Sequence, residues 1–176
     1  ATPEDAYSLL RNAIRFPNPV IFSEPKTLYS RTKTQKKELA GAEIGRAKIE
    51  KPGTDLTLIS WGSAMEVVRR LCSPLREKGV DCELLDLRTL FPFDRKTVLD
   101  SVKKTGRAVI AEEAPYWQGI GTRISAWITE NLFFDLEAPP IIAASENLPV
   151  PASEPLERQV LLQTEDVIAA VRRVME

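Results

Sequence analysis

Apolar residues recur along the chain in two alternating patterns, short continuous runs and stripes at helical spacing. The continuous runs predict buried strands at 56–61, 80–87, 107–113 and 139–145. The stripes, with apolar residues three and four positions apart, predict helices at 64–78, 94–106, 121–136 and 164–175. Strand followed by helix, repeated in this way, is typical of a parallel sheet with right-handed crossover connections.

Capping residues and helix breakers define several boundaries. A first helix is predicted over 3–15, because Thr2 can cap it and Pro3 suits the first helical position. Asp94 is the predicted cap of the helix over 94–106, which Gly106 closes, and Thr164 is the predicted cap of the last helix. Pro74 predicts a kink or a break inside the helix over 64–78.

The remaining segments have less regular patterns. Residues 18–24, NPVIFSE, predict a short buried strand that begins after Pro19, and residues 25–45 predict a polar, solvated loop. A Pro52-Gly53 turn separates an edge strand at 47–50 from the strand at 56–61. Residues 145–163 contain three prolines, so an ordered loop is expected there.

Composition limits the classes of function. The 176 residues are 43% hydrophobic, enough for one ordinary domain, and 24 Lys and Arg against 25 Asp and Glu give a net charge of -1. Such a balance provides no basic field for nucleic acid or an anionic membrane surface, so neither partner is expected. The absence of a Met before Ala1 indicates a piece of a longer chain.

Cysteine usage and hydropathy bear on redox chemistry and location. Cys72 and Cys82 lack the spacing of a metal motif, and the chain has no histidine, so neither a disulfide scaffold nor a zinc site is predicted. Both thiols are expected to be buried and reduced. No apolar stretch approaches the ~20 residues that span a bilayer, and no secretory leader is visible. The expected location is therefore cytoplasmic, or the mitochondrial matrix in a eukaryote.

The stretch VIAEEAPYWQGIG, 109–121, carries the candidate chemistry. Glu112 and Glu113 end a predicted buried strand, at the edge where open α/β sheets usually bind ligands. Adjacent strand residues point to opposite faces, so a pair that shares one proton is geometrically awkward. The favoured interpretation is a strand that runs out into solvent, with one glutamate capping or pairing locally.

Two loops contain glycines or a serine, residue types that bind phosphate or act as nucleophiles in other proteins. Gly119 and Gly121 resemble part of a dinucleotide fingerprint, but the spacing of the third glycine fails, which favours close packing against a neighbouring strand or subunit. Ser63 follows Gly62 without a lysine or a second glycine, so no P-loop is present. Without a histidine Ser63 is no triad nucleophile either, and a helix-cap role is expected.

Two aromatic residues follow the adjacent carboxylates. Tyr116 and Trp117 lie on a loop that should be exposed, where large apolar side chains indicate an interface. Core packing is the alternative for both. Taken alone, these residues describe an α/β docking or structural unit and provide no enzyme mechanism.

The chain resembles a known family in the segments IFSEPKTLYS, GTDLTLISWGSAMEVV, CELLDLRTLFPFDRKTVLDSVKKTGRAVIAEEAP and LEAPP. These are similar to the carboxyl-terminal domain of the beta subunit of the decarboxylase component in 2-oxoacid dehydrogenase complexes, within the transketolase carboxyl-terminal family. The resemblance covers nearly all of 1–176. It implies a single three-layer α/β/α sandwich, with a mostly parallel sheet of about five strands and an antiparallel edge strand.

The resemblance also implies a division of labour in the complete enzyme, which oxidatively decarboxylates a 2-oxoacid and acylates a lipoyl domain. Thiamine diphosphate and magnesium would be bound outside this chain, by a preceding beta-subunit domain that supplies the catalytic glutamate and by the alpha subunit. This domain would serve assembly, with a second beta subunit and the alpha subunit as partners and a lipoyl acyltransferase component as a further one. No cofactor and no activity are expected in the isolated domain.

Two groups of residues follow from this picture. The interface residues are predicted to be Glu112, Glu113, Tyr116, Trp117, Gly119 and Gly121. Asp86, Arg88 and Thr89 are predicted to be structural, tying a strand end to the following LFPFD turn by charge-assisted hydrogen bonds.

Departures from the family pattern mark two places. Glu112 stands where many relatives have the histidine of His-Glu-Ala-Pro, and 146–151 read ENLPVP where relatives often read PDTPVP. The segment EPKTLY, residues 24–29, is more similar to the corresponding segment of branched-chain 2-oxoacid enzymes than to that of pyruvate enzymes. The alternatives are a terminal domain of a transketolase or deoxyxylulose-phosphate synthase, which would need a basic pocket for sugar phosphates, and a non-catalytic binding module of the same fold.

Overall fold

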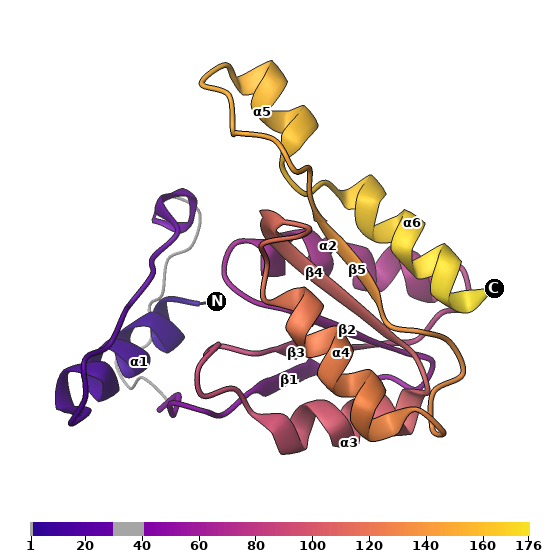
Figure 1. The fold of residues 1–176 in the computed structure, drawn as a ribbon, viewed down its shortest axis with the longest axis horizontal. Coiled ribbons are helices and arrows are strands. Elements are labelled where there is room, and N and C mark those ends of the chain that lie inside the picture. The colour runs from indigo at the N-terminus through magenta and orange to yellow at the C-terminus, as the bar shows by residue number, and fades with distance from the viewer. Residues whose placement is uncertain (1, 30–40) are drawn as a thin grey trace.

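A five-stranded mixed sheet forms the centre of the molecule (Figure 1). The computed structural model describes residues 2–29 and 41–176. The strands lie in the order β1-β3-β2-β4-β5, and only the edge strand β1 is antiparallel to its neighbour. Their bounds are β1 Lys48–Lys51, β2 Leu56–Ser60, β3 Cys82–Asp86, β4 Ala108–Pro115 and β5 Ile141–Ser145. The predicted mostly parallel sheet with one antiparallel edge strand is confirmed.

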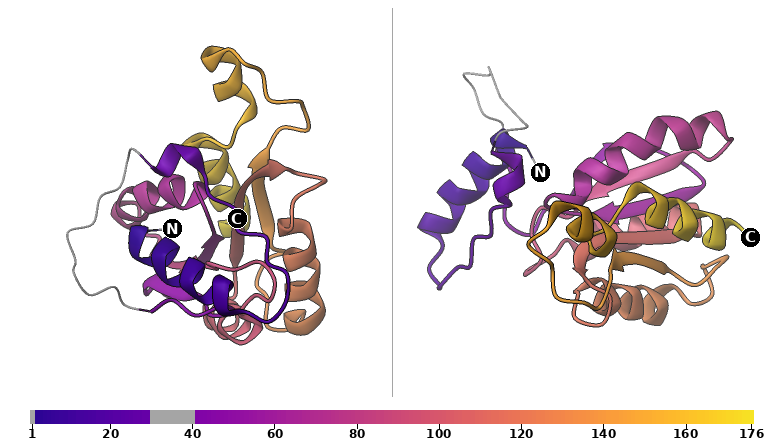
Figure 2. Two further views of the ribbon diagram at one scale, coloured as in Figure 1. Left: turned by 90° about the vertical axis from the view of Figure 1, so that its left-hand side faces the viewer. Right: turned by 90° about the horizontal axis from the view of Figure 1, so that it is seen from above.

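Helices cover both faces of this sheet (Figure 2). In chain order, the described helices of the molecule are α1 Pro3–Arg15, the short 3-10 helix Lys26–Leu28, α2 Ala64–Glu77, α3 Arg95–Thr105, α4 Gly121–Leu132, α5 Glu154–Val160 and α6 Thr164–Met175. Side chains of α2 and α6 pack in one apolar layer, and those of α3 and α4 pack in the other. The predicted three-layer α/β/α arrangement is therefore confirmed.

The alternation of side chains along each strand divides the core between these two layers. Leu58 packs in the layer under α2 and α6, whereas its neighbour Ile59 packs in the layer under α3 and α4. All residues of β2 and β3 are buried, as expected for parallel strands covered on both faces.

The two strands that flank the Pro52-Gly53 turn do not pair with each other. β1 pairs with β3, so the chain must cross the beginning of β3 to enter β2 on its other side. During this crossing the backbone N–H groups of Thr54 and Asp55 donate to the Asp81 carbonyl, at 3.1 and 3.0 Å. Gly53 lies so close to β3 that an added Cβ would be 2.5 Å from the carbonyl oxygen of Cys82.

Several sequence expectations are corrected. Residues 18–24 form no strand and are not buried; Ile21, for example, is 98% exposed. The three apolar residues of this segment do not pair with a described strand, and without such pairing they form no strand of their own. Residues 145–163 contain the helix α5, and Pro74 does not divide α2. Gln163, rather than Thr164, caps α6, through a reciprocal pair of bonds with Asp166. Part of the loop predicted at 25–45 lies outside the described residues.

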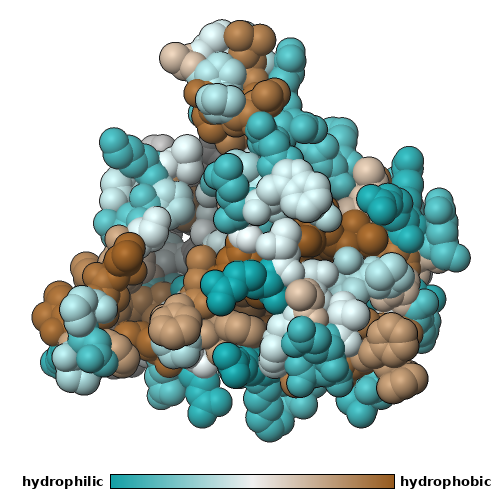
Figure 3. Space-filling view, viewed as in Figure 1, coloured by the Kyte–Doolittle hydropathy of each residue, from teal (hydrophilic) through white to brown (hydrophobic). Residues whose placement is uncertain are grey.

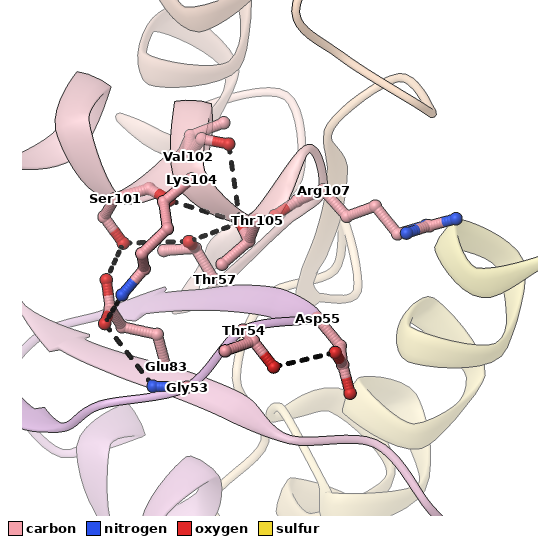
Figure 4. Close-up of polar contacts among 10 residues, drawn as sticks. All are labelled: Gly53, Thr54, Asp55, Thr57, Glu83, Ser101, Val102, Lys104, Thr105 and Arg107. Carbon is pink, nitrogen blue, oxygen red and sulfur yellow. Dashed lines mark hydrogen bonds and ion pairs between the residues drawn. The ribbon is translucent and has the colours of Figure 1, made fainter.

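A buried polar network fastens α3 to the sheet (Figure 4). Glu83 on β3 is 1% exposed and accepts a hydrogen bond from the Ser101 hydroxyl at 2.6 Å, while the Lys104 ammonium pairs with its other oxygen. The Ser101 hydroxyl in turn meets that of Thr57 at 2.8 Å. Because each polar group has a partner, the network avoids the cost of unsatisfied buried groups.

Two parts project from the sheet and its helices (Figures 1 and 2). One contains α1, and the other is residues 147–159, which include most of α5 and are called the arm below. The base of the arm is closed by a bond from Glu146 N to Val160 O at 2.9 Å and one from Leu162 N to Ser145 Oγ at 3.1 Å. No described helix is both long and apolar enough to cross a membrane.

Candidate functional site

The candidate site lies at the carboxyl edge of the sheet, between the ends of β2 and β4. The chain leaves β2 to reach β3 on one side, whereas β4 lies on the other side, so the loops after β2 and β4 diverge at this point. Such a reversal of strand order is where open α/β sheets usually have a crevice. Here the Ser63 hydroxyl from the first loop donates to the Glu113 carboxylate and bridges the two loop ends.

Ser63 occupies the cap position of α2, as the sequence predicts, but its side chain makes no capping bond. Its hydroxyl goes to Glu113 instead. Glu113 is exposed and Glu112 is buried, which confirms that the adjacent carboxylates point to opposite faces. The pair therefore cannot share a proton.

Glu112 fixes the loop after β4 from inside the domain. Its side chain is 1% exposed, and its two carboxylate oxygens accept from Gly121 N at 3.1 and 3.2 Å, at the start of α4. Burial raises the pKa of the Glu112 carboxyl, and the backbone N–H donors only partly oppose this effect. The carboxylate thus occupies the helix start, where the partial positive charge of α4 favours an anion.

The two glycines of the GIG sequence make room for this carboxylate. A Cβ added to Gly121 would lie 2.5 Å from Glu112 Oε1, and one added to Gly119 would come closer than 3.0 Å to all three atoms of the carboxyl group. Close packing of the loop against a strand is confirmed, and the contact is with a β4 side chain of the same chain. Glu112, Gly119 and Gly121 form the inner support of the loop.

Tyr116 and Trp117 lie on the outer side of that loop. They are 38% and 76% exposed, and their rings meet edge to face with centroids 5.1 Å apart. Tyr116 N donates to the Ser145 carbonyl and Trp117 N to the Asn147 side chain, each at 3.2 Å. The loop is therefore tied to the end of β5, and the core alternative fails for Trp117 within this chain.

The arm adds apolar surface that the sequence reading did not assign to the site. It begins beside Trp117, because Asn147 is its first residue. Leu148, Val150 and Leu156 are 58%, 56% and 51% exposed, and hydrophobic surface is visible at the top of Figure 3. The signal for this surface in the sequence is a set of apolar residues between prolines, a pattern that by itself predicts only a loop.

Asp86, Arg88 and Thr89 make polar contacts at and after the end of β3, one of which differs from the expectation. Asp86 Oδ1 accepts from Arg88 N at 2.9 Å, and the Thr89 hydroxyl donates to Pro92 O at 2.9 Å. The prediction places the Arg88 guanidinium against the following turn. In the structure it pairs instead with Asp5 on α1, at 2.6 Å. Arg88 has a φ of 57°, which aims it out of the strand direction toward α1.

Replacing Arg88 by alanine is expected to lower the free energy of unfolding by about 2 kcal/mol, because Asp5 would lose a partner in a largely buried pair. Protease cleavage near α1 should also become faster. Thermal unfolding and timed proteolysis would measure both effects. Lys96→Ala, which removes an exposed ion pair with Asp100, is the control and should leave the unfolding transition essentially unchanged. Unchanged unfolding in Arg88→Ala would contradict the structural role.

The described residues do not assemble a metal centre or a reactive thiol. Within 2–29 and 41–176, no three or more His, Cys, Asp or Glu side chains are grouped as metal ligands. Cys72 and Cys82 are free and buried, and burial raises the pKa of the Cys82 thiol to about 12. Cys82 is therefore protonated near neutral pH and is a poor nucleophile.

Comparison with known proteins identifies the family. The family model "Transketolase, C-terminal domain" matches residues 45–167. The chain is 39% identical over 174 residues to the pyruvate dehydrogenase E1 component subunit beta of Rhizobium meliloti, covering 98% of this chain and 38% of that protein. It is 47% identical over 142 residues to the mitochondrial 2-oxoisovalerate dehydrogenase subunit beta of Dictyostelium discoideum, covering 79% and 38%.

A solved structure of a split-gene transketolase, described as an inactive beta4 tetramer, superposes with a TM-score of 0.64 at 26% identity. The superposition covers 77% of this chain and 43% of that one. Across these comparisons the chain spans roughly two fifths of the length of its relatives. The chain belongs to the transketolase C-terminal domain family, and within it resembles the beta subunits of 2-oxoacid dehydrogenases.

Proposed function

We propose that this chain is the assembly domain of a thiamine diphosphate-dependent 2-oxoacid dehydrogenase beta subunit. The complete enzyme would decarboxylate a 2-oxoacid and pass the acyl group to a lipoyl domain. This domain would hold the alpha subunit and a second beta subunit in position, and a lipoyl acyltransferase component is a further candidate partner. The 39% and 47% identities to two such beta subunits support this class.

The exposed Tyr116–Trp117 pair is the observation that carries the assembly role. A tryptophan that is 76% exposed in one chain is costly to leave in water and suits the centre of a protein interface. The loop that bears it is held rigidly, by Glu112 below and by bonds to β5 and the arm at the side. A preorganised loop loses little entropy when a partner binds.

Among residues 2–29 and 41–176, the side chains are not arranged to hold thiamine diphosphate or magnesium. Magnesium prefers carboxylate and phosphate oxygens in octahedral geometry, and the described carboxylates are not grouped for it. Glu112 already fills the start of α4, where a diphosphate would otherwise find backbone donors. The cofactor would supply the carbon chemistry, and this domain would supply position and contact surface.

Sequence identity favours a dehydrogenase over a transketolase. The split-gene transketolase shares the fold, but its 26% identity is below the 39% and 47% found with the dehydrogenase beta subunits. Reconstitution of a full-length beta subunit that contains this domain with a cognate alpha subunit, thiamine diphosphate and magnesium would test the class. Turnover of pyruvate or a branched-chain 2-oxoacid is expected, and turnover of sugar phosphates alone would overturn the proposal.

Replacing Trp117 by alanine is expected to leave the domain folded and to weaken alpha-subunit binding or self-association by about 2 kcal/mol or more. Sedimentation and unfolding should be measured on the same variant. Phe134→Ala is the matched control, since Phe134 is a 98% exposed aromatic beyond the far end of α4. A loss of ~3–5 kcal/mol of folding stability, typical of a core aromatic, would contradict the interface role.

A further inference from the structure

A hollow of about 170 Å³ lies between the carboxyl-terminal halves of α2 and α6. Its lining includes Leu71, Leu75 and Val171, which are buried members of the apolar layer under these helices. Ile168 and Met175 also line it and are only partly buried. A dry apolar cavity of about 150 Å³ holds one benzene ring, so this hollow has room for an apolar tail of about six carbon atoms.

Two cations interrupt an otherwise apolar lining. Lys78, just after α2, and Arg172, on α6, line the hollow and are exposed, and among the described residues no Asp or Glu lines it. Neither cation forms an ion pair with a described carboxylate, whereas Arg76 nearby in the chain pairs with Asp81 at 3.8 Å. The hollow therefore combines an apolar interior with unpaired positive charge at its opening.

We propose that this hollow binds a short aliphatic monocarboxylate, with its tail between α2 and α6 and its carboxylate at the opening, beside Lys78 and Arg172. Burial of the tail provides most of the affinity, since each buried methylene group strengthens binding about fourfold. The carboxylate stays at the surface, where it keeps part of its hydration and avoids the cost of a buried charge. The two cations attract an anion and disfavour an amine of equal length.

A sugar or a sugar phosphate fits the same lining less well. The lining side chains other than the two cations are aliphatic, proline or methionine, so buried hydroxyl groups of a sugar would lack side-chain partners. None of the residues 112–121 lines the hollow. The proposal therefore does not depend on the assembly role of Trp117.

The two methionines of the chain provide the test, because Met175 lines the hollow and Met65 is fully buried in the core. Carbon-13 labelled methionine methyl groups give one NMR signal for each residue, and hexanoate is the probe. Near neutral pH, hexanoate is expected to shift the Met175 signal to saturation and to leave the Met65 signal in place. A Kd on the order of 1 mM is expected for so small a ligand.

Matched ligands separate the contribution of the tail from that of the charge. Hexan-1-ol should bind at least about threefold more weakly than hexanoate, because it lacks the attraction to the two cations. Acetate has no tail and should leave the Met175 signal unchanged. Decanoate should gain less than about fourfold over hexanoate, since its additional carbon atoms extend beyond the hollow.

Variants of the lining complete the test. Ile168→Phe fills the hollow and should abolish the response of Met175 to hexanoate. Replacing the exposed residues Lys78 and Arg172 together by glutamine should leave the fold intact and make hexanoate and hexan-1-ol bind equally. Arg173→Gln is the matched control, because Arg173 is the neighbouring cation on α6 but lines the groove between β5 and α6, so the preference for hexanoate should persist.

Several results would overturn the proposal. They are the absence of a saturable Met175 shift, a Met65 shift as large as that of Met175, and hexan-1-ol that binds the wild type as tightly as hexanoate. Loss of the preference for hexanoate in Arg173→Gln would also overturn it, because the effect would then reflect net charge instead of the two cations at the opening.

Discussion

Replacing Gly53 by alanine is expected to lower the free energy of unfolding by at least about 3 kcal/mol. The added Cβ would come closer than 3.0 Å to three backbone atoms of β3: the carbonyl carbon and oxygen of Cys82 and the nitrogen of Glu83. Backbone atoms of a strand paired on both sides cannot move aside without breaking the pairing. Urea unfolding followed by circular dichroism would measure the loss.

Gly41→Ala is the matched control for this substitution. Among the described residues, a Cβ at Gly41 would meet no atom within 4 Å, so a change within about 0.5 kcal/mol is expected. Neither glycine has a positive φ, so the comparison isolates the overlap with β3 from backbone strain. Equal stability of the two variants would mean that the backbone before β2 can shift away from β3 at little cost, which would contradict this prediction.

Replacing Gly119 by alanine is expected to cost about 3 kcal/mol, because the new methyl group would displace the Glu112 carboxylate and break its bonds to Gly121 N. The loop that carries Trp117 should then lose its fixed position. Unfolding measurements would give the loss of stability, and amide hydrogen exchange of residues 116–120 would report the freedom of the loop.

A double-mutant cycle separates this effect from a general intolerance of Gly119. In a Glu112→Ala background the methyl group has space, so adding Gly119→Ala should cost less than about 1 kcal/mol. A coupling energy near zero would show that Glu112 and Gly119 act independently. In that case the carboxylate would not be what positions the loop.

Local signals in the sequence predicted most of the sheet and its helices. Asp94 and Gly106 bound α3 as expected, because a side-chain cap and a left-handed glycine act within a few residues. The three prolines of 145–163 predict a loop and conceal α5, although a proline in the first turn, such as Pro155, is compatible with a helix. The strand expected at 18–24 does not form, because a strand also needs a neighbouring strand with which to pair, and local sequence does not show whether one is present.

The candidate site was only partly predictable. Strand alternation established that Glu112 and Glu113 face opposite sides, but it could not say which side α4 would cover. The contact of Glu112 with Gly119 and Gly121 depends on where the helix begins and how the loop returns across the strand end. Likewise the pairing of Arg88 with Asp5 joins residues 83 positions apart, which no local pattern reveals.

The closed base of the arm has a consequence for how this chain can vary. Because Glu146 N bonds to Val160 O, residues 147–159 leave and re-enter at a single point, and the joint between β5 and α6 does not need them. Lengthening such a loop costs little additional closure entropy, about 0.6 kcal/mol for each doubling. We therefore expect that the arm can be shortened, replaced by the equivalent segment of a homologue, or extended by an inserted reporter peptide without disrupting the sheet.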